Sequence, residues 1–112
     1  MPVQLLLSQK GPLPIKATFK VMSDQPVYLE VNGSVWTQTA NNMIGIQIAI
    51  DDGAPVGTAN IFSNTSSTHR AVVPAYIPLQ LPFGQHTITL STQPGTTTVS
   101  DFNDFYTAVI HY

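Results

Sequence analysis

Alternation of apolar with small or polar residues, at a period of two, most constrains the fold of this chain. It is clearest at residues 43–50, where Ile44, Ile46, Ile48 and Ile50 occupy every second position. In a β-strand, successive side chains point to opposite faces, so the four isoleucines share one face. We expect a central strand that is buried on at least one side. No segment of useful length keeps the i, i+3, i+4, i+7 spacing of an amphipathic helix.

Segments of similar character recur at intervals of about 8–12 residues, and Gly, Pro, Asn and Asp separate them. Asn32-Gly33, between residues 27–31 and 34–37, is typical of a two-residue hairpin turn. About eight short antiparallel strands in 112 residues predict an all-β fold, a β-sandwich or a barrel, in a single domain over residues 1–112. The other expected strands are residues 3–7, 15–22, 56–62, 69–73, 78–81, 87–91 and 105–112.

Charged residues make up only 9% of the chain, and the net charge is −2; soluble proteins average about 25% charged residues. Nucleic-acid binding needs a basic stripe that displaces counterions, and this sequence has none, so we exclude that class. No apolar run approaches the ~20 residues of a membrane-spanning helix, so we expect no membrane insertion. Thr, Ser, Asn and Gln supply the polarity, which suits contact with neutral polar partners or with copies of the chain itself.

Residues 1–7 lack the basic start and the long apolar run of a signal peptide. We therefore expect the chain to be cytoplasmic as synthesised, or to reach a virion or cell surface by a route that needs no signal peptide. Removal of a leader is the remaining alternative. The chain has no cysteine, so disulfides and thiolate metal sites are excluded.

The sequence contains side chains of the kind that bind sugars. Such sites place an aromatic ring against the apolar side of the sugar, while amide and basic groups reach its hydroxyls. The candidate ligand-binding residues are Trp36, Asn41, Asn42, Arg70 and Tyr76. An ordinary core or interface aromatic is the competing interpretation of Trp36.

No catalytic constellation is recognisable. The chain has no cysteine, no G-x-S-x-G elbow and no glycine-rich phosphate loop. Glu30 is the only glutamate, and the paired aspartates lie in expected loops rather than at the defined separation of glycosidase carboxylates. We therefore expect that the protein is not an enzyme.

A loop before the last expected strand carries Asp101, Asn103 and Asp104. Calcium takes six to eight oxygen ligands, including carboxylates, and Asp51 and Asp52 would add two if the fold brought the loops together. Asp and Asn are also ordinary turn formers that cap backbone amides. The sequence predicts no resident cofactor, with calcium at this loop as the alternative.

The three histidines, His69, His86 and His111, fall on three different expected strands. Three imidazoles are a known ligand set for zinc. The tight H-x-H spacing of β-barrel metal sites is missing, however. We favour separate histidines whose polar atoms are satisfied within the fold or at an interface.

Residues 81–90 (LPFGQHTITL), followed by a polar loop and an apolar terminal strand, resemble the small jelly rolls of the tumour-necrosis-factor and complement-C1q type. These occur at the C-terminal ends of bacterial and phage surface proteins, and the resemblance covers residues from about 54 to 112. It implies a jelly-roll β-sandwich of about eight short antiparallel strands, and a homotrimer in which one face of the last strand lines the threefold axis. We take that face to be Tyr106, Ala108, Ile110 and Tyr112. The alternative is Phe105, Thr107, Val109 and His111, with the other set in the core.

Residues 100–104 (SDFND) are also similar to the calcium loop of small bacterial fucose- and mannose-binding lectins. That similarity implies Asp101, Asn103 and Asp104 as calcium ligands. The chain departs from those lectins at residues 96–99, which are Thr-Thr-Thr-Val instead of further acidic residues. It also ends in Tyr112, where those lectins end in a glycine carboxylate that joins a partner's site.

The sequence thus predicts a non-enzymatic binding module that recognises cell-surface glycans in a lectin-like way as a homo-oligomer. The alternative is a structural virion or surface component, such as a fibre tip or capsid decoration protein, which acts through trimer assembly.

Overall fold

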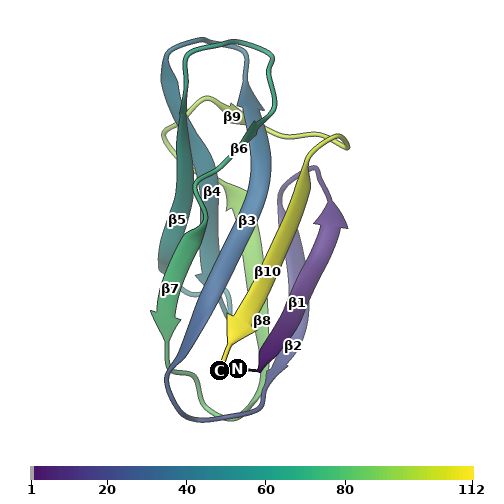
Figure 1. Ribbon diagram of the computed structural model, residues 1–112, viewed down its shortest axis with the longest axis vertical. Coiled ribbons are helices and arrows are strands. Elements are labelled where there is room, and N and C mark those ends of the chain that lie inside the picture. The colour runs from purple at the N-terminus through teal and green to yellow at the C-terminus, as the bar shows by residue number, and fades with distance from the viewer. Residues whose placement is uncertain (1) are drawn as a thin grey trace.

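The computed structural model describes residues 2–112, which form two β-sheets packed face to face (Figure 1). The first sheet has the order β1 (Val3–Lys10), β10 (Phe105–His111), β3 (Val27–Thr37) and β7 (Ala75–Leu79). Two short strands, β6 (Arg70–Ala71) and β9 (Thr98–Val99), pair with the far half of β3. The second sheet has the order β2 (Ile15–Val21), β8 (Gly84–Thr92), β4 (Asn42–Ile50) and β5 (Pro55–Ser63).

Every strand pair in the two sheets is antiparallel. Among the eight longer strands, consecutive strands lie in opposite sheets except at the β4–β5 turn. The first strand pairs with the last, so the two ends of the chain lie side by side (Figure 1). This order is that of a jelly roll, and the predicted fold class is confirmed. Within residues 2–112, no stretch forms a helix of the length and apolar character required to cross a membrane.

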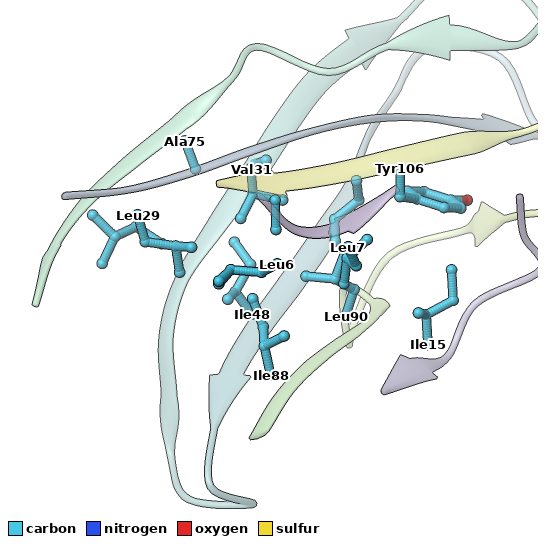
Figure 2. Close-up of a cluster of buried hydrophobic side chains, with 14 of the residues drawn as sticks. Leu6, Leu7, Ile15, Leu29, Val31, Ile48, Ala75, Ile88, Leu90 and Tyr106 are labelled. Atoms are coloured by element: carbon cyan, nitrogen blue, oxygen red, sulfur yellow. The ribbon is translucent and has the colours of Figure 1, made fainter. Parts of the chain in front are cut away.

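The core lies between the two sheets. Ile44, Ile46 and Ile48 are fully buried and Ile50 is nearly so, which confirms the face that their alternation predicted. In Figure 2, Leu29 and Val31 from one sheet face Ile48, Ile88 and Leu90 from the other. Burial of each such side chain contributes about 1.5–3 kcal/mol relative to leaving it exposed.

The predicted hairpin at Asn32-Gly33 is wrong, because β3 runs without a turn through both residues. A type I′ turn needs positive φ at its two central residues, and neither Asn32 nor Gly33 has it. Gly33 serves a different purpose, since it makes room for the ring of Tyr106 on the adjacent strand. A Cβ atom at Gly33 would lie 2.4 Å from Tyr106 Cδ1 and 2.9 Å from Ile46 Cδ1.

Residues 69–73 form a much shorter strand than predicted, the two-residue β6. The two backbone amides that follow β6 donate to different sheets. Val72 N donates to Gly33 O at 2.9 Å, and Val73 N donates to Asn60 O at 2.9 Å. Gly33 lies in the first sheet and Asn60 in the second. The segment therefore crosses between the sheets and does not extend one of them.

The predicted oligomer interface on the last strand is also wrong. Tyr106, Ala108 and Ile110 are fully buried and belong to the core of the chain itself. Tyr112 is partly buried; its hydroxyl donates to Gln4 Oε1 and accepts from Met22 N at 3.2 Å. The alternative set alternates with these residues and points away from the second sheet: Phe105, Thr107, Val109 and His111.

Candidate functional site

The structure does not bring the predicted ligand-binding residues into one site. Trp36 lies on β3 opposite Val99 of β9, whereas Tyr76 on β7 lies opposite Glu30. Glu30 and Trp36 are six positions apart on one strand, about 20 Å at a rise of ~3.3 Å per residue. Arg70 is part of β6, opposite Val35. Trp36 and Tyr76 therefore cannot contact the same sugar ring.

The predicted asparagines have turn-forming roles. Asn41 has a φ of 63°, a left-handed conformation that Asn tolerates better than most residues. The Asn42 side-chain amide donates to the carbonyls of Thr39 at 3.0 Å and Ala40 at 3.1 Å. These contacts hold the β3–β4 connection in shape. Within residues 2–112, the surface has no pocket that would enclose a small ligand.

The loop at residues 100–104 is organised by capping contacts. Asp104 is fully buried; its Oδ2 accepts from Asp101 N at 2.9 Å and its Oδ1 from Ser34 Oγ at 2.7 Å. Asp101 Oδ1 accepts from Asn103 N at 2.8 Å, so Asn103 enters this network through its backbone. The loop therefore does not direct the side-chain oxygens of Asp101, Asn103 and Asp104 at one point, as the alternative calcium site would require.

The other acidic residues proposed for that calcium site lie elsewhere. Asp51 accepts from the His86 ring at 2.6 Å and from Thr87 N at 2.9 Å. Asp52 forms an exposed ion pair with Lys16 at 2.8 Å. Both aspartates belong to the turn between β4 and β5, and both have partners there.

Each histidine is paired with a carboxylate on a distant part of the chain. His69 Nδ1 lies 2.6 Å from Asp104 Oδ1, His86 Nδ1 lies 2.6 Å from Asp51 Oδ2, and His111 Nε2 lies 2.7 Å from Glu30 Oε1. The three imidazoles thus belong to three separate pairs, and a three-histidine zinc site is not formed. The favoured interpretation, separate histidines with partners within the fold, describes the structure.

These pairs shift the pKa values of four of the residues in them: Glu30, Asp51, His69 and His86. The bond to Asp104 raises the pKa of His69, against a smaller opposing effect of burial. Bonds from Asn32 and then from His111 lower the pKa of Glu30. His86 donates from Nδ1 to Asp51 and from Nε2 to the Pro82 carbonyl at 2.7 Å. Because both ring nitrogens have acceptors, the imidazolium form is favoured and the pKa of His86 is raised.

A polar cluster forms where β6 meets the loop before β10. Its members are His69, Asp101 and Asp104, whose ligand atoms all lie within 4.8 Å of one another. The Trp36 ring lies beside it, 5.9 Å from the His69 ring between centroids. The indole Nε1 is buried and has no hydrogen-bond acceptor among residues 2–112. This cluster is one candidate site.

The outer face of the first sheet carries a second candidate, which we call the apolar patch. Val3, Leu5, Tyr28 and Tyr76 are 55%, 61%, 57% and 63% exposed. Strand register places them together: Val3 pairs with His111, which pairs with Tyr28, and Leu5 pairs with Val109, which pairs with Glu30 and then Tyr76. The Glu30–His111 pair lies within the patch, so the Glu30 carboxylate has a hydrogen-bond partner in its own chain.

Sequence reasoning missed most of the apolar patch. Alternation along residues 27–31 was visible and placed Tyr28 and Glu30 on one face. A β-bulge between Leu5 and Leu7 in the β1–β10 pairing breaks the alternation at residues 3–7, so the outward direction of Val3 and Leu5 was not readable. Which strands are neighbours was not readable either.

No family model and no curated protein matches this chain. Among solved structures, it is similar to an exo-β-1,3-galactanase from Phanerochaete chrysosporium with β-1,3-galactotriose, with a TM-score of 0.52 and 9% identity. The match covers 98% of this chain and 29% of the galactanase chain. At that identity the likeness shows the fold alone, and this chain corresponds to less than a third of the enzyme's length.

Two structures of infectious bursal disease virus also align. The Gt strain gives a TM-score of 0.47 at 14% identity, over 99% of this chain and 33% of the viral chain. The Gx strain gives 0.46 at 13% identity, over 97% and 31%.

Proposed function

We propose that this protein is a non-enzymatic module that assembles with copies of itself through the apolar patch. The observation that carries this proposal is the clustering of Val3, Leu5, Tyr28 and Tyr76, each more than half exposed, on one face of one sheet. Contiguous exposed apolar surface of this kind marks interaction sites in soluble proteins. Aromatic residues are enriched at such interfaces.

The charges favour a second copy as the partner. Glu30 and His111 lie 2.7 Å apart within the patch, so each chain brings a Glu30 carboxylate that already has a partner when copies of the patch meet around a threefold axis. Like charges would otherwise oppose a symmetric interface. A strongly charged partner would find no free charged group in the patch with which to pair. A homotrimer is the state that we propose, on the resemblance of the sequence to trimeric jelly rolls.

The non-enzymatic character is supported by how the polar groups are used. A serine nucleophile needs contact with a histidine base, but Ser34 and His69 both bond to Asp104 and not to each other. His86 is fully engaged by Asp51 and Pro82. In this proposal the module serves as a structural component of a virion or cell surface, where assembly itself is the task.

Sedimentation velocity over a range of concentrations tests the proposal. The wild type should sediment as a trimer of about 36 kDa, three times the chain mass of 12.1 kDa. Leu5→Glu should yield monomers, because it introduces a charge into the patch. Met43→Glu is the matched control, since Met43 is 48% exposed on the second sheet, and it should leave the trimer intact. A monomeric wild type at high concentration, or a trimeric Leu5→Glu, refutes the proposal.

Glycan recognition is the second candidate, and Trp36 favours it. Its ring is partly exposed and offers an apolar surface on which the apolar side of a sugar can pack. The structural neighbour is a carbohydrate-active enzyme solved with β-1,3-galactotriose, which makes β-1,3-galactans a reasonable first ligand class. On a glycan array, this idea predicts a signal that Trp36→Phe removes, and an array without signal rejects it.

A further inference from the structure

The polar cluster beside Trp36 has a feature that hydrogen bonding within the chain leaves unexplained. His69 Nε2 and Asp101 Oδ2 face each other at 3.8 Å, beyond the 2.7–3.2 Å of a protein hydrogen bond. The two side chains are 36% and 39% exposed.

Buried Asp104 decides which nitrogen of His69 is free. Asp104 Oδ1 lies 2.6 Å from His69 Nδ1, and a carboxylate can only accept, so Nδ1 carries a proton. In the neutral imidazole, Nε2 then bears the lone pair. A carboxylate that holds one ring nitrogen while the other is free is the arrangement that orients histidine ligands in metal sites.

Asp101 is held in a matching way. Its Oδ1 accepts from Asn103 N at 2.8 Å, and its main-chain oxygen accepts from Asp104 N at 3.1 Å. Its second carboxylate oxygen, Oδ2, faces His69. Two lone-pair atoms that face each other are stabilised by a cation between them, either a proton on Nε2 or a metal ion.

The separation is close to that of two ligands of one metal ion. Zinc–nitrogen and zinc–oxygen bonds are about 2.0–2.2 Å long, so two ligand atoms of one tetrahedral zinc lie about 3.4 Å apart. The 3.8 Å between Nε2 and Oδ2 exceeds this by about 0.4 Å, a difference that a small rotation of either partly exposed side chain closes. Calcium, by contrast, takes six to eight oxygens, and an imidazole nitrogen suits zinc, copper and nickel.

We propose that His69 Nε2 and Asp101 Oδ2 bind a divalent transition-metal ion, with Asp104 as the residue that orients His69. Asp104 is a positioning residue here, because its oxygens are occupied by His69, Ser34 and the Asp101 amide. The remaining coordination positions face solvent and are open to water or to a ligand. The proposal is independent of assembly through the apolar patch.

Trp36 provides a direct readout, because it is the only tryptophan and lies 5.9 Å from the His69 ring. Titration of the purified protein with Cu²⁺ should give saturable quenching of its fluorescence, and isothermal titration with Zn²⁺ should give one site per chain. Quenching should weaken as the pH falls, because protons compete with the metal for Nε2.

Three variants and a matched control separate the roles. His69→Gln and Asp101→Asn each remove a ligand and should weaken binding at least 10-fold. Asp104→Asn should weaken it about 10–100-fold, the usual effect of changing a ligand's orienting partner. His111→Gln, which alters a histidine–carboxylate pair on the other candidate surface, should bind as the wild type does. Thermal melting of each variant confirms that it is folded.

Zn²⁺-induced shifts of histidine ring resonances in the wild type give a test that needs no variant. The His69 resonances should move, and those of His86 and His111 should stay. Unchanged binding in His69→Gln or in Asp101→Asn overturns the proposal. So does the absence of saturable binding up to millimolar metal, or a Zn²⁺ response at His86 or His111 instead.

Discussion

The ring of Tyr106 on β10 lies directly against Gly33 on β3, so closely that a Cβ atom at Gly33 would come 2.4 Å from Tyr106 Cδ1. This contact lets a large aromatic residue occupy the core beside a neighbouring strand. It also explains why an Asn-Gly pair stands in the middle of a long strand. The glycine is required by close approach and not by a turn.

Gly33→Ala should therefore destabilise the protein by about 1–3 kcal/mol, as overpacking of a filled core does. The ring of Tyr106 and the Ile46 side chain would both have to move. Urea unfolding followed by Trp36 fluorescence measures the change. Gly53→Ala is the matched control, because a Cβ there meets only Ile50 O, at 3.2 Å, and it should have a smaller effect. Equal stability of Gly33→Ala and the wild type contradicts the assigned role.

Asp104 should be the polar residue whose loss most affects the loop before β10. Its buried carboxylate accepts from Ser34, His69 and the Asp101 amide, and each buried donor left unsatisfied costs about 1–3 kcal/mol. We expect Asp104→Ala to lower the free energy of unfolding by about 2–4 kcal/mol. Asp24→Ala, in an exposed loop, is the control. Hydrogen exchange of the Asp101 amide should rise in the first variant only.

The His86–Asp51 pair should make stability depend on pH. The pKa of His86 is raised by Asp51 and by the Pro82 carbonyl, so its contribution is complete below the unfolded value of about 6.5 and is lost as pH rises through the folded value. Burial tends to raise the pKa of Asp51, but bonds from His86 and Thr87 outweigh it and the net shift is downward. Its contribution is therefore present above the unfolded value of 3.8 and is lost as pH falls through the folded value.

The pair thus stabilises the fold most between about pH 4 and 6.5. His86→Gln should lower the melting temperature more at pH 5 than at pH 8.5, measured against the wild type at each pH. Asp52→Asn removes the exposed Lys16–Asp52 pair, which is worth under ~1 kcal/mol, and should show a small effect at both values. A His86→Gln effect that is independent of pH would falsify the assignment.

The hydroxyl of Tyr112 should hold the last residue of the chain in place. It donates to Gln4 Oε1 and accepts from Met22 N, and so ties the chain end to β1 and to the end of β2. Tyr112→Phe should cost about 1 kcal/mol, the net value of a typical hydrogen bond. Tyr28→Phe alters an exposed hydroxyl and should stay within about 0.5 kcal/mol of the wild type. Chemical denaturation of both variants and of the wild type measures these differences in the free energy of unfolding.

Assembly through the apolar patch should tolerate salt. An interface stabilised by apolar burial does not weaken when charges are screened, because Glu30 and His111 pair within each chain. Raising NaCl from 0.05 M to 0.5 M shortens the Debye length from about 14 to about 4 Å. We expect the trimer to be equally stable at the two concentrations. Dissociation at high salt, seen by light scattering, would show that charge steering and not apolar contact drives the association.

Part of this fold was readable from the sequence alone, for a local reason. A strand alternates its side chains between two faces wherever it lies, so the isoleucines of residues 43–50 identified a buried face without knowledge of their partners. Residues 105–112 likewise predicted the last strand, which spans Phe105–His111. Turn residues marked most of the boundaries, the number of strands indicated a sandwich or barrel, and the resemblance of residues 81–90 to small jelly rolls indicated which.

Tertiary structure decided the rest, because the deciding contacts join residues far apart in the chain. The Asn-Gly pair has local turn chemistry, yet the ring of Tyr106, 73 positions after Gly33, determines its conformation. The sequence left open which face of β10 is buried. The position of β10 between β1 and β3, packed against the second sheet, decides which face that is. The histidine–carboxylate pairs span 35 to 81 positions, so composition predicted titratable groups but only the fold could assign each its partner.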